Sequence, residues 1–409
     1  MIVYTLGPDE NGPIEADLIE LRPDRTELKS FSKPYLLTNQ PPKEGASFCD
    51  IAFGQPLGAL KESFPQIQWI YSFHGPFISF EETLNLIKKM DQQQPDLIKC
   101  CFDSISFCDY LNLYPIFQLY PDRLILFARG ESNQATRLLS YLWGARWIYT
   151  SKDGLYGQIP LKELLEDYQI RRLNKQTELY GLIKGIASPP SIGFKIYNPL
   201  FYKEGINALY LNLVLEENEL KEVLRSPLFR GFSITMPFKE KAFRFCENLS
   251  FCARLCESVN TYFLGVGYNT DIEILKKLSF RGKKVAILGG GGVAKAYANF
   301  LKNCCDVHLF VRCNTKRIKI QNEIRVRAFL LEDWVCDYDV LIDTLPITGL
   351  NLAIKKETIV IDAKVFHDRT YENQANFISG RDVFLAQGNA QMKIFFKKDF
   401  CLYQKFTIC

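Results

Sequence analysis

The sequence predicts an α/β protein in which an N-terminal (β/α)8 TIM-type barrel with abbreviated outer helices precedes a second α/β region and a Rossmann-type nucleotide domain. Three observations lead to this prediction. The N-terminal region contains eight short apolar runs, several of them separated by helical patterns. Further along, a buried strand runs into a glycine cluster after Leu288. The chain of 409 residues, 47% of them hydrophobic, is long enough for two or three domains with apolar cores.

Each apolar run of the N-terminal region has the length of a buried strand. Alternation of such runs with helical patterns, here Phe80–Met90 and Thr136–Trp143, predicts a parallel sheet, and eight units predict a barrel. Segments 7–16 and 39–47 have room only for a loop or a turn or two, so we expect some outer helices to be missing. The eight runs are Ile2–Leu6, Asp17–Leu21, Tyr35–Thr38, Phe48–Ala52, Trp69–Phe73, Leu97–Phe102, Arg123–Phe127 and Trp147–Thr150.

The composition is that of an ordinary folded protein. The formal net charge of +4 is spread along the chain without a block of like charges, so we expect no nucleic-acid or membrane partner. The 13 cysteines show no pair of CxxC motifs, which argues against a metal site, and scattered thiols are typical of a reducing compartment. The first residues lack signal-peptide features, and no stretch approaches the roughly 20 apolar residues of a membrane span. These features predict a cytoplasmic protein.

Beyond the barrel, the pattern changes twice. Leu161–Tyr168 is expected to form a terminal helix, and the polar run Arg171–Glu178 is expected to be a linker. A second α/β pattern starts near Leu179, and a third unit begins near Phe280 with the strand Lys284–Leu288.

That strand leads into a glycine-rich turn and then a helical pattern. Glycines at such a turn let the backbone approach a pyrophosphate, which the positive end of the following helix stabilises. A tight structural turn is the alternative, but the strand–turn–helix context favours dinucleotide binding. The residues of the predicted cofactor loop are Gly289, Gly290, Gly291, Gly292, Val293 and Ala294.

The next strand, Val307–Val311, ends in a basic residue instead of the acidic one that would bind a ribose 2′-hydroxyl. Arg312 and Lys316 favour a 2′-phosphate, and therefore NADP(H) as the cofactor. A solvated basic loop is the alternative interpretation.

Polar motifs upstream of the glycine turn are suited to ketone reduction. Hydride reduction needs a proton donor beside the carbonyl, and Lys239 with Asp271 can fill that role. Taken singly, each residue would more often be a surface charge. The motifs are Ser233–Lys239 (SITMPFK), Ser258–Thr261 (SVNT) and Gly267–Asp271 (GYNTD).

These motifs resemble the Asn-Val-Thr-x-Pro-x-Lys, Val-Asn-Thr and Asn-Thr-Asp elements of the shikimate dehydrogenase family, over about residues 180–400. The resemblance implies a shikimate-dehydrogenase-like α/β substrate domain and catalytic roles for Lys239 and Asp271. It implies that the substrate is bound by Ser191, Thr235, Asn260 and, in the C-terminal Gln-Gly element, Gln387. The chain departs from the family at Gly193 (a serine), Ser233 (an asparagine) and Val365 (a tyrosine).

In the N-terminal region, Lys99 lies inside an apolar strand, and His74 ends the strand before it. Burial of an ammonium group is costly, so we expect desolvation to lower the pKa of Lys99 toward the free amine, which can form a Schiff base with a ketone. A lysine at a frayed strand edge, with its tail at the surface, is the alternative.

This region resembles type I 3-dehydroquinate dehydratase. The family's Glu-x-Arg-x-Asp, Ser-x-His, strand lysine, Ser-Arg and Gly-Gln elements correspond to Glu20-Leu-Arg22-Pro-Asp24, Ser72-Phe-His74, Lys99, Thr136-Arg137 and Gly157-Gln158. The resemblance implies that Lys99 forms the Schiff base and that His74 moves the proton. Glu44 could pair with His74 and set its basicity. Gln40 and Gly154 stand where the family has an arginine and a serine. The implied substrate-binding residues are Glu20, Arg22, Glu44, Arg137 and Gln158.

Together, the two resemblances imply a bifunctional enzyme that dehydrates 3-dehydroquinate to 3-dehydroshikimate and reduces the product to shikimate with NADPH. The expected domains are a barrel at 1–172, a substrate domain at 178–272 and 376–409, and a nucleotide domain at 273–375. A ligand-sensing regulator derived from such enzymes, or a chain in which only the dehydrogenase half is active, are the alternatives. The sequence does not indicate an oligomeric state, or a preference between quinate and shikimate.

Overall fold

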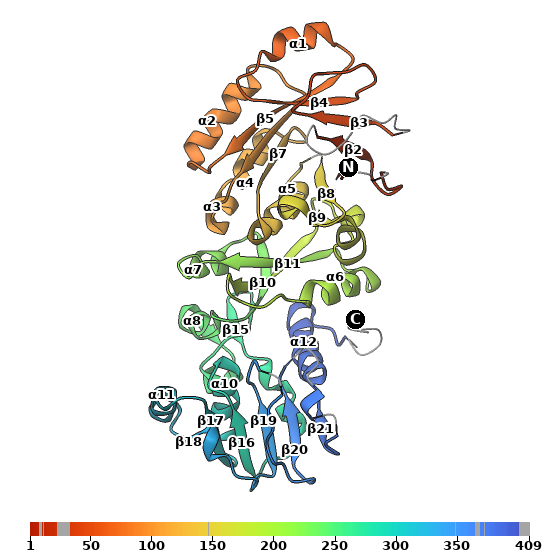
Figure 1. Cartoon of the computed structure of the whole chain (residues 1–409). Helices are drawn as coiled ribbons and strands as arrows, with labels where there is room; N and C mark the ends of the chain where they lie inside the picture. Colours follow the sequence, from red (N-terminus) through yellow and green to blue (C-terminus); the bar gives the residue numbers. More distant parts are fainter. Residues whose placement is uncertain are drawn as a thin grey trace. The chain divides into compact units, whose positions relative to one another are not determined.

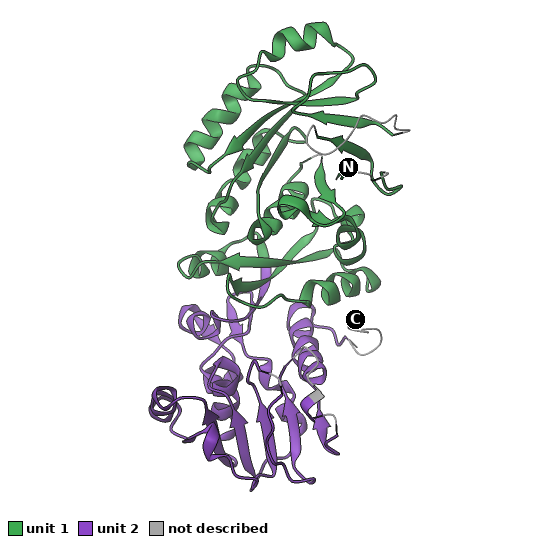
Figure 2. Ribbon diagram, viewed as in Figure 1, with its two compact units in different colours: residues 1–229 green, residues 230–409 purple. Residues whose placement is uncertain are grey.

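The computed structural model describes residues 1–7, 10, 12–22, 33–145, 147–347, 349–364, 369–371 and 373–400. The chain divides into two compact units, residues 1–229 and 230–409 (Figures 1 and 2). Within the described part, no helix combines the length and the apolar character that a membrane crossing requires.

The first unit begins with a parallel sheet whose strands confirm the eight predicted runs. The order of the paired strands is β7-β6-β5-β4-β3-β2-β1-β8-β9, and each pairing is parallel. The pairing of β8 with β1 brings the last predicted strand back beside the first. The bounds are β1 Ile2–Thr5, β2 Leu18–Leu21, β3 Tyr35–Thr38, β4 Phe48–Ala52, β5 Gln68–Gly75, β6 Leu97–Phe102, β7 Leu124–Ala128, β8 Ile148–Ser151 and β9 Ile159–Pro160.

The helices around this sheet are few and short. Helix α2 (Phe80–Asp91) begins at Ser79, whose hydroxyl accepts a hydrogen bond from the backbone of Glu82 and caps the first turn. Both predicted helices are present, and so are three shorter ones that the sequence analysis did not predict. The three unpredicted helices are α1 Leu57–Ser63, α3 Phe107–Asn112 and α4 Tyr114–Leu119, and the second predicted helix is α5 Gln134–Leu142. The described residues of segments 7–16 and 39–47 contain no helix, as expected from their length.

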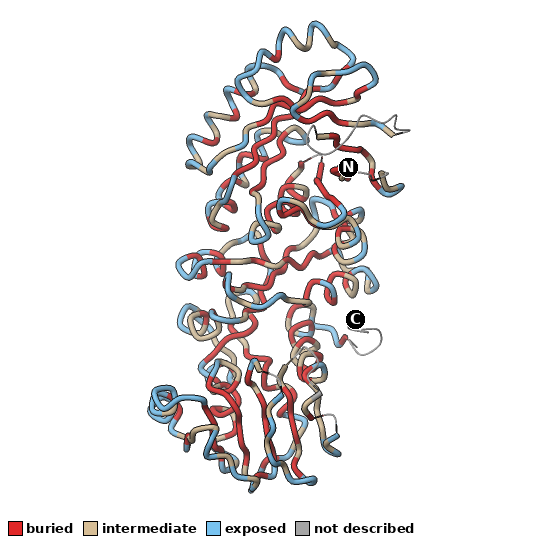
Figure 3. Tube along the Cα trace, viewed as in Figure 1, coloured by how far each residue is buried: buried red, intermediate tan, exposed pale blue. Residues whose placement is uncertain are grey.

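One face of the sheet carries a cluster of buried apolar side chains. Each of the strands β1 to β8 contributes at least one buried side chain to a single cluster, and buried residues follow the strands in Figure 3. The cluster consists of Val3, Leu18, Leu36, Phe48, Ile70, Leu97, Cys101, Ile125, Phe127, Ala145, Trp147 and Tyr149.

The rest of the first unit follows the predicted second pattern. Residues 161–167 are helical, as expected of the terminal helix, and include the turn η3 (Glu163–Asp167). After η4 (Ile170–Arg172), strand β10 (Glu178–Gly185) pairs in parallel with β11 (Ala208–Leu215) along its whole length. Helix α6 (Gly193–Lys203) packs on β11, and helix α7 (Leu220–Arg225) packs against α3.

The second unit opens with a small mixed sheet in the order β12-β14-β15-β13. Its elements are β12 Phe229–Ile234, α8 Lys239–Phe245, β13 Asn248–Leu249, α9 Phe251–Cys256, β14 Thr261–Phe263 and β15 Val266–Tyr268, followed by the short turns η5 Asp271–Glu273 and η6 Leu275–Lys277. Asp271 therefore opens a single 3-10 turn.

A six-stranded parallel sheet follows, in the order β18-β17-β16-β19-β20-β21. Counted along the chain this is 3-2-1-4-5-6, the strand order of Rossmann-type nucleotide folds, which places a ligand crevice at the end of the first strand. Alternate residues of β16 face two separate apolar clusters, because successive side chains of a strand point to opposite faces. The bounds are β16 Lys284–Leu288, α10 Gly292–Leu301, β17 Asp306–Val311, α11 Asn314–Ile324, β18 Arg327–Leu330, η7 Leu331–Asp333, β19 Val340–Asp343, β20 Ile359–Asp362, η8 Arg369–Tyr371 and β21 Phe377–Ile378.

The last described helix, α12 (Gly380–Phe396), returns to the start of this unit. It contacts β14 and η5, and the ring of Phe395 lies 5.7 Å from that of Phe263.

Candidate active sites

The buried lysine of the barrel region is paired with a buried aspartate. Lys99 lies in the middle of β6 with 2% of its surface exposed, and its Nζ donates to Oδ2 of Asp50 at 2.6 Å. Asp50 is fully buried in β4 and was not among the predicted site residues. Burial alone would lower the pKa of Lys99, but the charge and hydrogen bond of Asp50 outweigh burial and raise the pKa. The expected lowering of this pKa was therefore wrong, because it ignored the partner.

His74 lies next to this pair, near the carboxyl end of β5. The β5–β6 register places it beside Cys101, two residues beyond Lys99. Desolvation by the surrounding protein, together with the positive charge of Lys99, lowers the pKa of His74 to about 4, although the side chain is exposed. The imidazole is therefore neutral near pH 7 and able to accept a proton.

A second buried carboxylate, that of Glu20, is held by hydrogen bonds and by an ion pair. Glu20, at the end of β2, accepts hydrogen bonds from the hydroxyls of Thr5 (2.5 Å) and Thr38 (2.8 Å). It also pairs with Arg22 at 3.3 Å. Burial would raise the pKa of Glu20, but Arg22 and Lys99 outweigh burial and keep it below its usual value. Glu20 thus remains charged and holds Arg22 in place.

Arg137, in α5, is a buried guanidinium that has no carboxylate partner in the described part of the chain. It is 4% exposed, donates to the backbone oxygen of Tyr156 at 3.0 Å, and lies 4.2 Å above the ring of Phe127. Burial, with a contribution from the charge of Arg22, lowers the pKa of Arg137 to about 10, so the group stays positive at neutral pH. An unpaired buried cation is costly, which indicates that an anionic ligand completes this site.

Lys99, His74, Arg22 and Arg137 line one cavity of about 410 Å³. Gln158 belongs to it and donates to Thr5 at 3.0 Å. Four buried polar atoms of this group have no hydrogen-bond partner among the described residues: Asp50 Oδ1, Arg137 Nε, Tyr149 Oη and Gln158 Oε1. A cavity with so many unsatisfied polar groups fits a small, polar, anionic ligand. The lining residues are Arg22, Thr38, Asn39, His74, Lys99, Cys101, Phe127, Arg129, Arg137, Tyr149, Tyr156 and Gln158.

The structure does not bring every predicted barrel residue to the cavity. Glu44 is exposed in the β3–β4 loop, where its backbone oxygen accepts from Tyr35 at the start of β3. His74 lies at the opposite end of the parallel strands, so the expected pairing of Glu44 with His74 was wrong. Gln40 turns away and donates to the backbone of Leu21.

Two further positions complete the comparison with the predicted barrel site. Gly154 precedes the turn η2 (Leu155–Gly157) that leads to Gln158. Asp24, the last residue of the Glu-x-Arg-x-Asp element, lies outside the described residues.

A second site lies in the unit that begins at residue 230. Lys239 Nζ, at the start of α8, donates to Asp271 Oδ2 at 2.6 Å, and both side chains are mostly buried. Asn260 donates to the other carboxylate oxygen of Asp271 at 2.9 Å. The three residues predicted from separate motifs therefore form one hydrogen-bonded group.

The predicted cofactor loop lines a cavity of about 430 Å³ together with Thr235 and Lys239. Gly289 has a φ of +111°, and a Cβ on it would approach Oγ1 of Thr344 to 2.5 Å, so glycine is required. A Cβ on Gly290 would meet Cδ1 of Ile320 at 2.2 Å, whereas Gly291 faces open space beside the start of α10. A narrow backbone cradle at a helix N-terminus fits a pyrophosphate. The lining residues are Thr235, Met236, Pro237, Lys239, Glu240, Gly289, Gly290, Gly291, Gly292, Val293, Val311, Arg312, Cys313, Lys316, Thr344, Leu345 and Pro346.

At the end of β17 the cavity is basic. Arg312 and Lys316 are exposed and lie on its wall, about where the strand order places the ribose of a dinucleotide. Ala294 is fully buried in α10 and contributes to the core, not to the cavity.

The other predicted substrate residues are placed as follows. Ser191 belongs to the first unit, just ahead of α6, and its hydroxyl accepts from the backbone of Gly193 at 3.2 Å. Gln387 is half-buried in α12. Gln391, one turn further along α12, was not predicted; it accepts from Ser233 at 3.1 Å and donates to the backbone of Asn260. Val365 lies outside the described residues.

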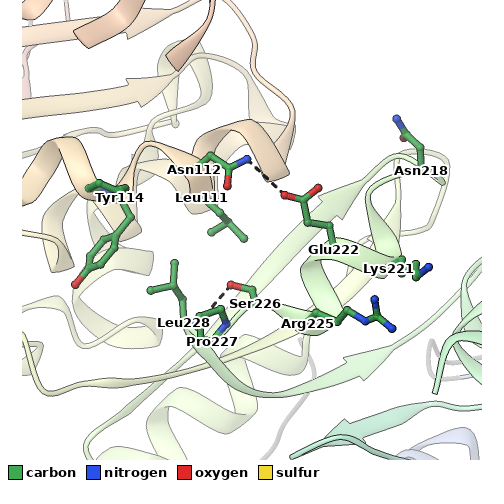
Figure 4. A pocket seen from close by; sticks show the side chains of 11 residues that line it. Leu111, Asn112, Tyr114, Asn218, Lys221, Glu222, Arg225, Ser226, Pro227 and Leu228 are labelled. Carbon is green, nitrogen blue, oxygen red and sulfur yellow. Dashed lines mark hydrogen bonds between the residues drawn. The ribbon is translucent and has the colours of Figure 1, made fainter. Parts of the chain in front are cut away.

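A larger cavity, of about 740 Å³, carries none of this chemistry. It lies among α3, α4 and α7, where Asn112 donates to Glu222 at 3.4 Å (Figure 4). None of its lining residues is a buried acid or base, so cavity size alone does not mark the active site.

Together, the fold and the sites define a Rossmann-like α/β protein of the shikimate dehydrogenase type. Residues 186–262 match the family model described as "Shikimate dehydrogenase substrate binding domain". A shikimate dehydrogenase (NADP(+)) of Pyrobaculum aerophilum is 31% identical, covering 46% of this chain and 68% of that protein. A crystal structure of the Aquifex aeolicus shikimate dehydrogenase superposes with a TM-score of 0.50 at 27% identity, covering 56% of this chain and 96% of that one. The chain belongs to the shikimate dehydrogenase family.

Two relatives extend over the N-terminal region as well. The "Shikimate biosynthesis protein AroDE" of Chlamydia pneumoniae is 28% identical, covering 90% of this chain and 81% of its own. The chloroplastic "Bifunctional 3-dehydroquinate dehydratase/shikimate dehydrogenase" of Arabidopsis thaliana is 25% identical, covering 78% of this chain and 61% of its own.

Proposed function

We propose that the chain is a bifunctional enzyme of the shikimate pathway, which dehydrates 3-dehydroquinate to 3-dehydroshikimate and then reduces this product to shikimate with NADPH. The observation that carries the proposal is the pair of separate lysine–aspartate groups. Lys99, paired with Asp50, lines a cavity together with a neutral histidine, and Lys239 and Asp271 lie ahead of a dinucleotide cradle. The bifunctional relative supports the same combination.

In the first reaction, Lys99 must lose a proton before its amine attacks the C3 carbonyl, and Asp50 is the acceptor at 2.6 Å. Loss of water from the adduct gives an iminium, which acidifies the C2 proton. His74 removes that proton and returns it to the C1 hydroxyl, which leaves as water. Hydrolysis of the iminium then releases the product and restores Lys99. Arg137 binds the substrate carboxylate throughout.

The charge state of His74 sets the pH dependence of this half. Its pKa of about 4 means that the neutral base persists well below pH 6. We expect kcat/KM for 3-dehydroquinate to stay level down to about pH 5 and to fall as the pH drops through about 4. A pH–rate profile measured with buffers of constant ionic strength checks this, and a descent centred near pH 6.5 would contradict it.

In the second reaction, NADPH supplies the hydride when it is bound. Lys239 is placed to protonate the carbonyl oxygen of 3-dehydroshikimate, and Asp271 orients the ammonium by a 2.6 Å hydrogen bond. Asn260 occupies the other oxygen of Asp271 and so leaves Oδ2 to the lysine. Ser191, Thr235 and Gln387 would bind the substrate carboxylate and hydroxyls.

Arg312 and Lys316 would bind the 2′-phosphate. We expect Arg312→Ala to raise KM for NADPH about ten- to a hundredfold, since a charge-assisted hydrogen bond contributes about 1.5–3 kcal/mol. The use of NADH should not change. Lys319→Ala, which removes an exposed lysine of α11 that does not line the cavity, is the matched control. An equal rise in KM for NADPH and for NADH would show that Arg312 does not bind the 2′-phosphate.

The proposal includes a closed barrel for the N-terminal sheet. The Nζ of Lys99 on β6 lies 4.8 Å from the ring centre of Tyr149 on β8, and the ring of Phe127 on β7 lies 6.2 Å from the same ring. Contacts between strands at the two ends of the paired order support a sheet that curls on itself. We retain the boundaries 1–172, 178–272 with 376–409, and 273–375 for the three domains. The free thiols of the described cysteines support a cytoplasmic location.

The direct test is a coupled assay. The protein, given only 3-dehydroquinate and NADPH, is expected to produce shikimate and to oxidise one NADPH per shikimate formed. If 3-dehydroshikimate is reduced while 3-dehydroquinate is not consumed, only the dehydrogenase half is active. If neither compound turns over, the proposed function is wrong and a ligand-sensing role takes its place.

A further inference from the structure

Tyr149 carries a hydroxyl that forms no hydrogen bond with any described residue. The residue lies in β8 with 3% of its surface exposed and lines the cavity of Lys99. Its phenol oxygen is buried and has no hydrogen-bond partner among the described residues. Leaving a buried hydroxyl unpaired is unfavourable, and a phenylalanine would fill the same space without that penalty. No described residue pairs with this hydroxyl, so it is available to hydrogen-bond a ligand bound in the cavity.

The position of Tyr149 relative to Lys99 limits what this partner can be. The ring centre of Tyr149 lies 4.8 Å from the Nζ of Lys99. His74 stands on β5, which pairs with one edge of β6, whereas Tyr149 contacts Phe127 of β7, which pairs with the other edge. His74 and Tyr149 thus approach the lysine from opposite sides.

A ketone substrate that is joined to Lys99 has one neighbouring carbon on each side of the linkage. In 3-dehydroquinate the C3 carbonyl is flanked by the C2 methylene and by C4, which bears a hydroxyl. His74 acts at C2, so C4 faces the side of Tyr149. We propose, on the basis of the proposed function, that Tyr149 is a substrate-binding residue whose hydroxyl donates a hydrogen bond to the C4 hydroxyl and so fixes the ring of the bound substrate.

Two further features of the site support this assignment. Burial raises the pKa of Tyr149 against the opposing charge of Lys99, so the phenol remains protonated and can donate. The ring also lies beside the nitrogen that carries the positive charge in both the ammonium and the iminium, where an aromatic face stabilises a cation. The hydroxyl and the ring therefore have separable roles.

Tyr149→Phe separates them, since it removes the hydroxyl and keeps the ring. We expect kcat/KM for 3-dehydroquinate to fall about ten- to a hundredfold, the loss of one buried hydrogen bond to substrate. The melting temperature should stay level or rise, because an unpaired polar atom is removed. With a 4-deoxy analogue of the substrate, the wild type and the variant should react equally well.

The matched control is Tyr71→Phe. The Tyr71 hydroxyl accepts from the backbone of Gly54 and donates to that of Gln55, so its loss should lower the melting temperature and leave kcat/KM unchanged. The inference is overturned if Tyr149→Phe keeps kcat/KM within twofold, if the loss persists with the 4-deoxy analogue, or if activity and melting temperature fall together. A wild type that neither dehydrates 3-dehydroquinate nor forms a borohydride-stable adduct would refute the proposed function as well. An active wild type with an unaffected variant would refute the role of Tyr149 alone.

Discussion

Replacing Lys99 by alanine is expected to abolish the dehydration of 3-dehydroquinate, with a loss in kcat of about ten-thousand-fold or more, because Lys99 is the one lysine among the described residues that line the cavity. The reduction of 3-dehydroshikimate should continue, since Lys239 and Asp271 lie in the other compact unit. Initial rates of both half-reactions on the same preparation check the prediction.

Lys99→Ala also leaves Asp50 buried without its partner, which typically destabilises a fold by about 3–5 kcal/mol. A second variant, Lys99→Met with Asp50→Asn, removes both charges and keeps most of the side-chain volume. It should fold more stably than Lys99→Ala and be equally inactive as a dehydratase. Residual dehydration within tenfold of the wild type, in either variant, would contradict the covalent mechanism.

Replacing Lys239 by alanine is expected to lower kcat for the reduction of 3-dehydroshikimate about a hundred- to ten-thousand-fold, the usual contribution of a positioned proton donor. KM for NADPH should change little, because the glycine cradle and Arg312 remain. Dehydration of 3-dehydroquinate should be unaffected. Stopped-flow or steady-state measurement of NADPH oxidation gives both constants.

Lys277→Ala, which removes an exposed lysine in the turn η6 beyond Asp271, is the control for a general loss of positive charge. It should behave as the wild type. A variant Lys239→Ala that keeps its kcat and shows only a raised KM for 3-dehydroshikimate would mean that the lysine binds the substrate and that another group protonates it.

Eight strands of the first parallel sheet and the first two of the nucleotide sheet could be predicted from the sequence, because buried parallel strands are short apolar runs bounded by turns. Strands β9 and β18 to β21 were not predicted. Strand β6 and the run Leu97–Phe102 coincide, as do β16 and Lys284–Leu288. The helices α1, α3 and α4 were missed, since six or seven residues give too short a window for a helical period.

The candidate sites were predictable where a local motif marks them and not where a partner is remote in sequence. Lys99 stands out as a cation in an apolar strand, but Asp50 lies 49 residues away and nothing near it in the sequence points to the lysine. The direction of the Lys99 pKa was wrong for that reason. Glu44 was expected to pair with His74, although it lies ahead of the strand Phe48–Ala52 and the start of a parallel strand lies at the edge opposite to the site.

The central claim is that Lys99 forms a Schiff base with 3-dehydroquinate, and reductive trapping tests it most directly. The protein is incubated with 3-dehydroquinate, treated with borohydride, and weighed intact and after digestion. The account predicts a ligand-sized mass increase on the peptide that carries Lys99, absent from Lys99→Ala and from samples without substrate. An unmodified Lys99 peptide, from protein that still reduces 3-dehydroshikimate with NADPH, would contradict it.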